Sequence, residues 1–211
     1  MGSKLRRIYS RLYKHFGPQH WWPGETPFEV AVGAILTQNT NWGNVEKAIG
    51  NLKRERVLSP RTMHGLSVNK LASFIRPAGY FNIKAMRLKN FLSLLLLEYG
   101  GSMKKMQKED LATIRERLLS VNGIGPETAD SIILYALEKP VFVIDAYTKR
   151  VLSRHNIKAH DASYDEFQQF FHSGLNKDVQ TFNEYHALFV RLAKDHCRTK
   201  PLCSGCPLER I

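Results

Sequence analysis

Apolar residues recur along most of this chain at spacings of three and four, the period of an amphipathic α-helix. The pattern holds over residues 4–16, 27–37, 43–53, 68–75, 83–98, 109–120, 126–137, 146–154, 163–173 and 181–195. The most convincing strand-like run is VFVID at residues 141–145, which is too short and isolated to imply a sheet. The pattern therefore predicts an all-α fold.

Two helical domains are predicted from the order of these segments. Residues 23–137 form a continuous series of helical segments and contain a helix-turn-helix pair at about 112–131. Residues 1–22 and 138–211, from the two ends of the chain, are expected to build the second domain together. A chain of 211 residues can bury a good core in either one large or two small domains.

The charge balance favours a polyanionic partner. Lys and Arg number 31 against 19 Asp and Glu, which gives a formal net charge of +12. Such an excess suits nucleic acid, although a membrane-surface protein would share it. No apolar run approaches the ~18 residues of a transmembrane helix, and the basic N-terminus lacks an apolar signal core. We expect a cytoplasmic, monomeric protein of the bacterial or archaeal nucleoid, with no membrane partner.

The sequence VNGIGPET, residues 121–128, places two glycines between two helical segments. A dinucleotide-binding loop would follow a strand and carry a third glycine, and a phosphate loop of the Walker type would continue with Gly-Lys-Ser/Thr. What remains is a tight turn in which Gly123 and Gly125 can present backbone amides beside Pro126 at a helix N-terminus. This turn is either a grip on a phosphate backbone or an ordinary connection between two helices.

Asp145 follows the apolar run 141–144 and precedes a basic helical segment. Aspartate at this place is often a simple helix N-cap. The alternative is a catalytic carboxylate whose pKa is tuned by apolar neighbours.

These segments together resemble a known family. VNGIGPETAD followed by VFVIDAYTKRVLSR is similar to the helix-hairpin-helix motif and catalytic aspartate of the endonuclease III (HhH-GPD) superfamily of DNA glycosylases. GAILTQNTNWGNVEKAI (33–49), RPAGYFNIKAMRLKNF (76–91) and the C-terminal cysteines extend the resemblance over nearly the whole chain. It implies two helical lobes that bind duplex DNA and take up a damaged base flipped out of the stack.

The resemblance assigns roles to individual residues. Asp145 is then the catalytic residue. The hairpin residues Gly123, Ile124, Gly125 and Thr128 contact the DNA backbone, with Na⁺ or K⁺ as a candidate bridging ion. Gln38 and Tyr80 occupy the positions of the side chains that fill the gap left by the flipped base.

A narrower resemblance concerns the base pocket. WWP at residues 21–23, together with LTQNT, RPAGYFN and the glutamate of GIGPETAD, is similar to the 3-methyladenine DNA glycosylase III branch. In that branch such aromatic residues line the pocket for alkylated purines, and stacking on a flat base suits them physically. The pocket residues expected here are Trp21, Trp22, Pro23, Leu36 and Trp42; packing within the core is the competing interpretation for the tryptophans.

Glu127 stands where bifunctional endonuclease III enzymes carry a lysine. That lysine forms a Schiff base and permits strand cleavage, whereas a carboxylate cannot form an imine. We therefore expect a monofunctional glycosylase that leaves an abasic site. The alternatives are a bifunctional glycosylase/AP lyase for oxidised pyrimidines, a mismatch uracil or thymine glycosylase, and a non-catalytic DNA- or abasic-site-binding module.

All three cysteines, Cys197, Cys203 and Cys206, lie within the last fifteen residues. Their spacing resembles the C-terminal [4Fe–4S] loop of endonuclease III, whose fourth cysteine would be expected about one residue beyond Ile211. Four thiolates are the usual set for such a cluster, so His196 or a group outside this sequence would have to complete it. Zinc is the competing metal, since Cys₃His sites are known.

Overall fold

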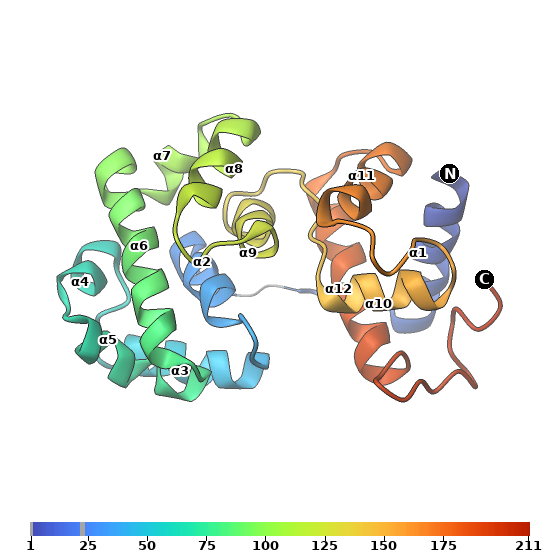
Figure 1. Cartoon of the computed structure of the whole chain (residues 1–211), viewed down its shortest axis with the longest axis horizontal. Coiled ribbons are helices and arrows are strands. Elements are labelled where there is room, and N and C mark those ends of the chain that lie inside the picture. Colours follow the sequence, from blue (N-terminus) through green and yellow to red (C-terminus); the bar gives the residue numbers. More distant parts are fainter. Residues whose placement is uncertain (1, 22–23) are drawn as a thin grey trace. The chain divides into compact units, whose positions relative to one another are not determined.

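The computed structural model describes residues 2–21 and 24–211. Within these residues every regular element is helical, which confirms the all-α prediction (Figure 1). The chain forms two compact units, one comprising Met1–Trp21 with Pro140–Ile211 and the other Trp22–Lys139. Each unit is described below by itself.

The central unit contains ten helical elements among its described residues. They are α2 (Pro27–Leu36), α3 (Trp42–Arg54), α4 (Pro60–Gly65), α5 (Val68–Phe74), η1 (Arg76–Ala78), α6 (Phe81–Tyr99), α7 (Met103–Gln107), α8 (Leu111–Ser120), α9 (Pro126–Ser131) and η2 (Ile132–Ala136). The element η2 is a single π-helical turn that directly continues α9. A π-turn of this kind is rare and widens the helix locally.

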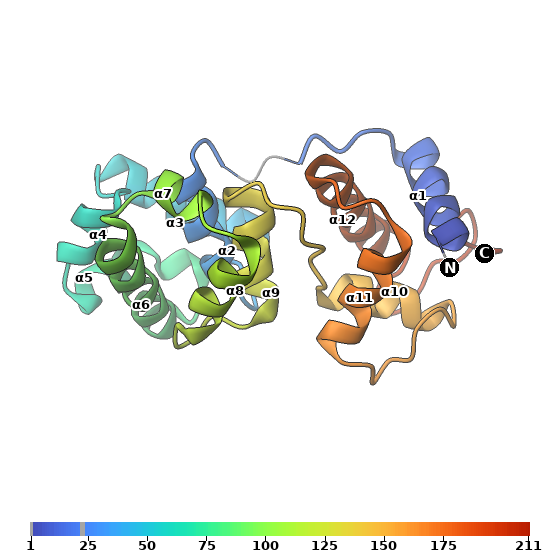
Figure 2. The same cartoon turned by 90° about the horizontal axis from the view of Figure 1, so that it is seen from above.

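Helix α2 forms the middle of this unit. It packs against α3, α6, α9 and η2, and Figures 1 and 2 show it enclosed by these helices. Thr26 caps its N-terminus by accepting a hydrogen bond from the N–H of Glu29 at 3.2 Å, and Pro27 occupies the first turn, where its missing N–H is not needed. Because α2 is apolar on all sides, it is buried almost throughout rather than along one stripe.

The terminal unit is built from both ends of the chain. Its described helices are α1 (Gly2–Phe16), α10 (Ala146–Arg154), α11 (Tyr164–Gly174) and α12 (Val179–Asp195). The hydroxyl of Tyr185 donates to the backbone carbonyl of Leu5 at 2.9 Å and so ties α12 to α1. Phe142, Phe171 and Phe189 surround Tyr185 in a fully buried aromatic core. The N-terminal helix is therefore an integral part of this unit.

Three short elements were not predicted, namely α4, η1 and α7. Each has fewer than seven residues, so the helical spacing is seen at most once and leaves no periodic pattern. The apolar run 141–144 is buried and has no regular secondary structure, so the described residues contain no strand there. No helix in the described ranges is long and apolar enough to cross a membrane.

Candidate functional site

The glycine turn connects α8 to α9. Gly123 has a φ of +94°, a conformation that other residues rarely adopt, and the turn is closed by a hydrogen bond from the N–H of Ile124 to the carbonyl of Val121 at 3.0 Å. Gly125 is the N-cap of α9 and is exposed, with open space where a Cβ would lie. Within residues 2–21 and 24–211 the N–H groups of Gly123 and Gly125 meet no acceptor. The turn thus presents two unsatisfied donors, while Ile124 uses its own donor inside the turn.

A buried ion pair joins the two helices of the hairpin. Nε of Arg115 on α8 lies 2.9 Å from Oδ1 of Asp130 on α9, and Nη2 lies 3.4 Å from Oδ2. The Asp130 side chain is fully buried, whereas that of Arg115 is partly exposed. This two-point contact fixes the angle at which the helices meet.

Gln38 connects the loop after α2 to the hairpin. Its Nε2 donates to the carbonyl of Gly123 at 3.0 Å and to Oγ1 of Thr128 at 2.9 Å, while its Oε1 accepts a hydrogen bond from Arg87 of α6. The Arg87 side chain also lies against Gly123, where a Cβ would come within 2.3 Å of its Cγ. Gln38 is therefore held by protein groups in this state, and the buried Thr128 hydroxyl faces Gln38.

Tyr80, directly before α6, has a largely exposed side chain. It is 67% exposed and has a φ of +45°, in the left-handed region, at the N-cap of α6. Three residues on, Ile83 is also exposed, and Met86 follows at the same spacing. A large apolar side chain held outward on a strained backbone is unusual without a binding partner.

Lys84 was missed by sequence reasoning and lies beneath this loop. It is 1% exposed, and its Nζ donates to the carbonyls of Leu36 at 2.9 Å and Ala78 at 2.7 Å. Burial, together with the charge of Arg87, lowers the pKa of Lys84 to about 8. The side chain thereby connects the end of α2, which leads to Gln38, with η1, which leads to Tyr80.

Asp145 caps helix α10 in the terminal unit. Its Oδ1 accepts a hydrogen bond from the N–H of Thr148 at 2.7 Å, which is the capping role considered above. The residue is 9% exposed. Burial alone would raise the pKa of Asp145, but the nearby His186 and the hydrogen bonds from Thr148 outweigh it and hold the pKa below its usual value. The carboxylate is consequently ionised at neutral pH.

His186 is the second residue that sequence reasoning missed. Its Nε2 lies 3.3 Å from Oδ2 of Asp145, and the residue is 6% exposed on α12. Trp21 packs edge-on against the imidazole, with ring centroids 6.5 Å apart. The chain holds eight histidines and no motif marks this one, so no sequence signal could have selected it.

The remaining pocket candidates are placed differently from one another. Leu36 is fully buried in the core, so it packs against the protein and presents no surface to a base. Trp42 is half-buried; it donates to Glu46 at 2.9 Å, and its ring lies against Gly33 of α2. Glu127 is exposed in the first turn of α9. The candidates Trp22 and Pro23 lie outside the described residues.

The cysteine segment 197–206 lies against α10. Arg150 donates to the carbonyl of Cys197 at 2.7 Å, and Arg154 to that of Thr199 at 3.0 Å. Burial raises the pKa of the Cys206 thiol, and the neighbouring Cys197 and Cys203 raise it further. No three His, Cys, Asp or Glu side chains in the described part of the chain are arranged to hold a metal ion. The three thiols supply three of the four thiolates in the usual cluster ligand set.

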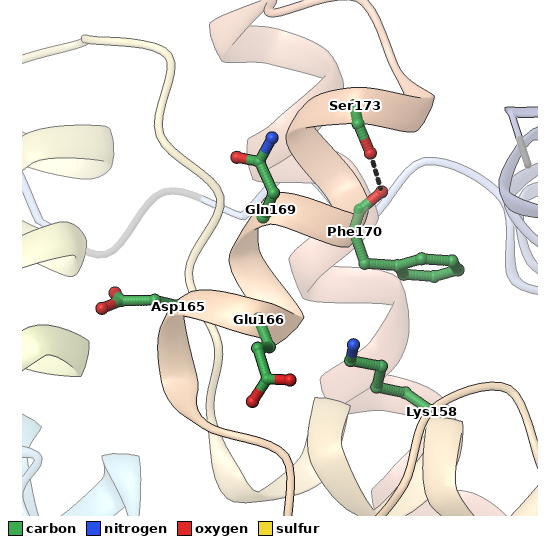
Figure 3. Close-up of a pocket in the computed structure, with 6 residues that line it drawn as sticks. All are labelled: Lys158, Asp165, Glu166, Gln169, Phe170 and Ser173. Carbon is green, nitrogen blue, oxygen red and sulfur yellow. Dashed lines mark hydrogen bonds between the residues drawn. The ribbon is translucent and has the colours of Figure 1, made fainter.

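A surface cavity of about 420 Å³ lies along α11, outside these sites (Figure 3). It is lined by Lys158, Asp165, Glu166, Gln169, Phe170 and Ser173. The Glu166 carboxylate accepts hydrogen bonds from the N–H and hydroxyl of Ser163, each at 2.8 Å, in a capping box. None of the predicted site residues lines this cavity.

Two helices, α8 and α9, joined by a tight glycine turn within an all-α chain place the protein in the class of helix-hairpin-helix proteins. The sequence matches the family described as HhH-GPD superfamily base excision DNA repair protein over residues 32–177. A relative from Methanocaldococcus jannaschii, named as a DNA repair glycosylase, is 49% identical over 98% of this chain and 94% of its own length. The chain therefore belongs to the HhH-GPD superfamily and is a DNA glycosylase of base excision repair.

Solved structures give the same fold. The Helicobacter pylori 3-methyladenine DNA glycosylase MagIII, bound to 1,N6-ethenoadenine, matches with a TM-score of 0.78 and 31% identity over 92% of this chain and 96% of that chain. A trapped endonuclease III–DNA covalent intermediate matches with a TM-score of 0.84 and 22% identity, covering 99% and 93% of the two chains. The resemblance to endonuclease III-like glycosylases is thus confirmed.

Proposed function

We propose that this protein is a monofunctional DNA glycosylase that removes an alkylated purine from duplex DNA and leaves an abasic site. The observation that carries the proposal is the ionised Asp145 carboxylate, capped by Thr148 and facing His186. A buried carboxylate that is ionised at neutral pH can stabilise positive charge on a sugar and accept a proton from water. A helix cap alone requires neither property.

In the proposed reaction, water replaces the base at C1′ of the sugar. The C1′–N bond breaks, its electron pair leaves with the base, and positive charge develops on the sugar. Asp145 stabilises that charge and accepts the proton of the attacking water. An alkylated purine already carries positive charge, so it departs without a strong general acid.

Glu127 supports the absence of a lyase step. It occupies the position of the lysine of bifunctional relatives, and its carboxylate cannot form an imine with C1′. Its place in the first turn of α9 also suits a negative charge, because the N-terminal end of a helix carries partial positive charge.

DNA is the proposed partner of the hairpin. The unsatisfied N–H groups of Gly123 and Gly125 point to a phosphate oxygen as their acceptor, directly or through Na⁺ or K⁺, and the net charge of +12 favours the same polyanion. Tyr80, exposed on its strained backbone, is the proposed wedge that fills the gap left by the flipped base. Gln38 would join it only after leaving its partners Gly123, Thr128 and Arg87.

An alkylated purine is the proposed substrate class. Its support is the 31% identical MagIII, whose structure was solved with an ethenoadenine, and the aromatic residues Trp21 and Trp42. The test is a base-release screen on duplexes carrying 3-methyladenine, 7-methylguanine, hypoxanthine, thymine glycol or uracil. Release of methylated purines above all others is expected. Preference for thymine glycol or uracil would overturn the substrate assignment.

A bifunctional glycosylase/AP lyase is the second candidate, favoured by one observation. Lys149 lies four residues beyond Asp145 on α10, so an amine stands within about one helical turn of the carboxylate. Borohydride trapping on abasic duplex DNA separates the two candidates, since only an imine gives a covalent protein–DNA adduct. A strong adduct would overturn the monofunctional proposal.

We also propose that Cys197, Cys203 and Cys206 belong to a [4Fe–4S] loop, with zinc as the competing metal. The proposal is supported by the spacing of the three cysteines along the chain. Iron, sulfide and zinc analysis of protein purified without oxygen, with an absorption spectrum, tests it. Four irons per chain are expected; stoichiometric zinc, or neither metal, would contradict it.

A further inference from the structure

His186 and Asp145 form a buried pair in the terminal unit. The imidazole Nε2 lies 3.3 Å from Oδ2, while Oδ1 is engaged by the N–H of Thr148 at 2.7 Å. Both residues are less than a tenth exposed. Each carboxylate oxygen therefore faces one defined group, and the rotation of the carboxylate is fixed.

A buried polar pair of this kind adds little net stability to the packing of two helices. Taking a carboxylate and an imidazole out of water costs free energy, and apolar side chains of similar volume commonly pack at least as well. The α12 core next to it does use apolar groups, with Phe182, Leu188 and Phe189 fully buried. The polar pair lies at the one carboxylate for which a chemical role is proposed.

We propose that His186 is a positioning residue for base release: it fixes the Oδ2 side of Asp145 and keeps that carboxylate ionised and oriented toward the reacting sugar. This inference rests on the proposed role of Asp145. Protonated, the imidazolium offsets the cost of burying the carboxylate. Neutral, the ring still occupies the space beside Oδ2, with Nε2 3.3 Å away.

The groups around the pair leave this role to His186. From α10, Thr148 supplies a backbone N–H, and the Lys149 ammonium lies over the Phe167 ring of α11. From α11, the Tyr164 hydroxyl accepts the N–H of Ile144 at 3.3 Å. From the N-terminal segment, Trp21 contributes an uncharged ring against the imidazole. Among the described residues, His186 is the one ionisable side chain that acts on the pKa of Asp145.

The decisive readout is the pH profile of single-turnover base release from methylated duplex DNA. In His186→Leu no imidazole offsets the effect of burial on the pKa of Asp145, so that pKa should rise. The acid limb of the rate–pH profile should then move to higher pH by about one unit or more. His186→Gln keeps a donor without the charge; its limb should also move, with a plateau closer to that of the wild type. A merely structural role would lower the rate by one factor at every pH and leave the limb in place, which would overturn the proposal.

His172→Leu is the matched control in the same unit. Its Nε2 accepts the N–H of Phe142 at 3.0 Å, so its loss should destabilise the unit without acting on Asp145. The variant should lower stability and leave the acid limb of the pH profile unmoved. An equal shift in His172→Leu would show that general destabilisation moves the limb, and would overturn the inference.

A double-mutant cycle separates this inference from the proposed function. The melting temperatures of wild type, Asp145→Asn, His186→Gln and the double variant should be non-additive at pH 7, because the two residues interact directly. Additive effects would overturn the pairing whatever the enzyme does. Full activity of Asp145→Asn beside a non-additive cycle would overturn the proposed function and leave the pairing intact.

Discussion

Asp145 combines a structural role with the proposed chemical role in one side chain. As an N-cap it accepts the N–H of Thr148, and as a buried carboxylate its pKa is held below the usual value by His186 and that hydrogen bond against the effect of burial. A carboxyl group whose pKa is lower in the folded than in the unfolded protein binds its proton only at a lower pH in the native state. It therefore stabilises the fold above the unfolded-state pKa of about 3.9, and that contribution is lost as pH falls through the folded pKa.

Asp145→Asn should reveal this linkage. Its stability deficit relative to wild type should be constant near neutral pH and should shrink as the pH falls below about 4, where the wild-type carboxylate is protonated as well. Chemical denaturation of both proteins between pH 2.5 and 7 measures the difference. A deficit that grows toward acid would show that the folded pKa of Asp145 is raised instead.

Lys84 is the opposite case, because burial lowers its pKa to about 8 and so penalises its charged form. Between pH 8 and the unfolded pKa of about 10.4, the unfolded chain binds the proton more tightly than the native state, so stability should rise with pH. The rise should amount to about 3 kcal/mol in wild type. Lys84→Met should lack it, which urea denaturation at pH 7.5 to 10.5 can measure; parallel profiles would contradict the assignment.

Residues that carry a recognisable pattern were predicted from the sequence, and residues that act through packing were not. Asp145 and Gly123 are marked by the segments around them. Lys84 acquires its contacts only when α6 packs against α2, and His186 meets Asp145 only when α12 packs against α10. A lysine or histidine on a helix is ordinarily at least partly solvated. The contacts of Lys84 and His186 join positions 48 and 41 residues apart, respectively.

At the scale of elements, the hairpin is the most sharply specified part of the chain. Gly123 needs its positive φ and leaves room for Arg87, while Gly125 begins α9 with open space around it. The turn and its helices could be predicted from the sequence, because glycine and proline mark tight turns and the first turn of a helix through their own backbone preferences. The Arg115–Asp130 staple and the contacts of Gln38 depend on tertiary structure and left no local sign.

Alanine at the two glycines separates folding from DNA binding. Gly125→Ala should keep stability within about 0.5 kcal/mol, since nothing in the protein meets the new Cβ, yet weaken binding to duplex DNA about tenfold by obstructing the phosphate. Gly123→Ala should cost about 1–3 kcal/mol of stability, because its Cβ meets Arg87 and its φ is strained. Thermal unfolding and fluorescence anisotropy measure the two effects.

Gly50→Ala is the matched control on α3. Gly50 is exposed in mid-helix with open space, so alanine should raise stability by about 0.5–1 kcal/mol and leave DNA affinity unchanged. If Gly125→Ala bound DNA as tightly as Gly50→Ala, the hairpin would not be the backbone grip.

For the whole molecule, the order of motifs was more informative than any one of them. The glycine turn, the aspartate after an apolar run and the two loop sequences together predicted an all-α HhH-GPD glycosylase, and the fold and the relatives confirm both. The base pocket was less predictable, because it depends on which faces the aromatic residues turn outward. Leu36 shows this directly: its position in the motif suggested the pocket, and the folding of α2 buries it in the core.

Glu127→Lys tests how the reaction type depends on a single group. Lysine restores the amine of bifunctional relatives, so this variant should form a borohydride-trapped adduct with abasic duplex DNA, while the wild type forms little or none. Glu127→Gln, which carries no amine, serves as the control. An equally strong adduct from all three proteins would assign the imine to another amine, with Lys149 the first to replace.

The most direct test of the account is single-turnover base release from methylated duplex DNA by wild type and Asp145→Asn, with DNA affinity measured alongside. The account predicts a loss of about 10²–10⁴-fold in the rate of base release with DNA binding largely preserved, because the carboxylate acts on the reacting sugar. Release of the base by Asp145→Asn at the wild-type rate would contradict it.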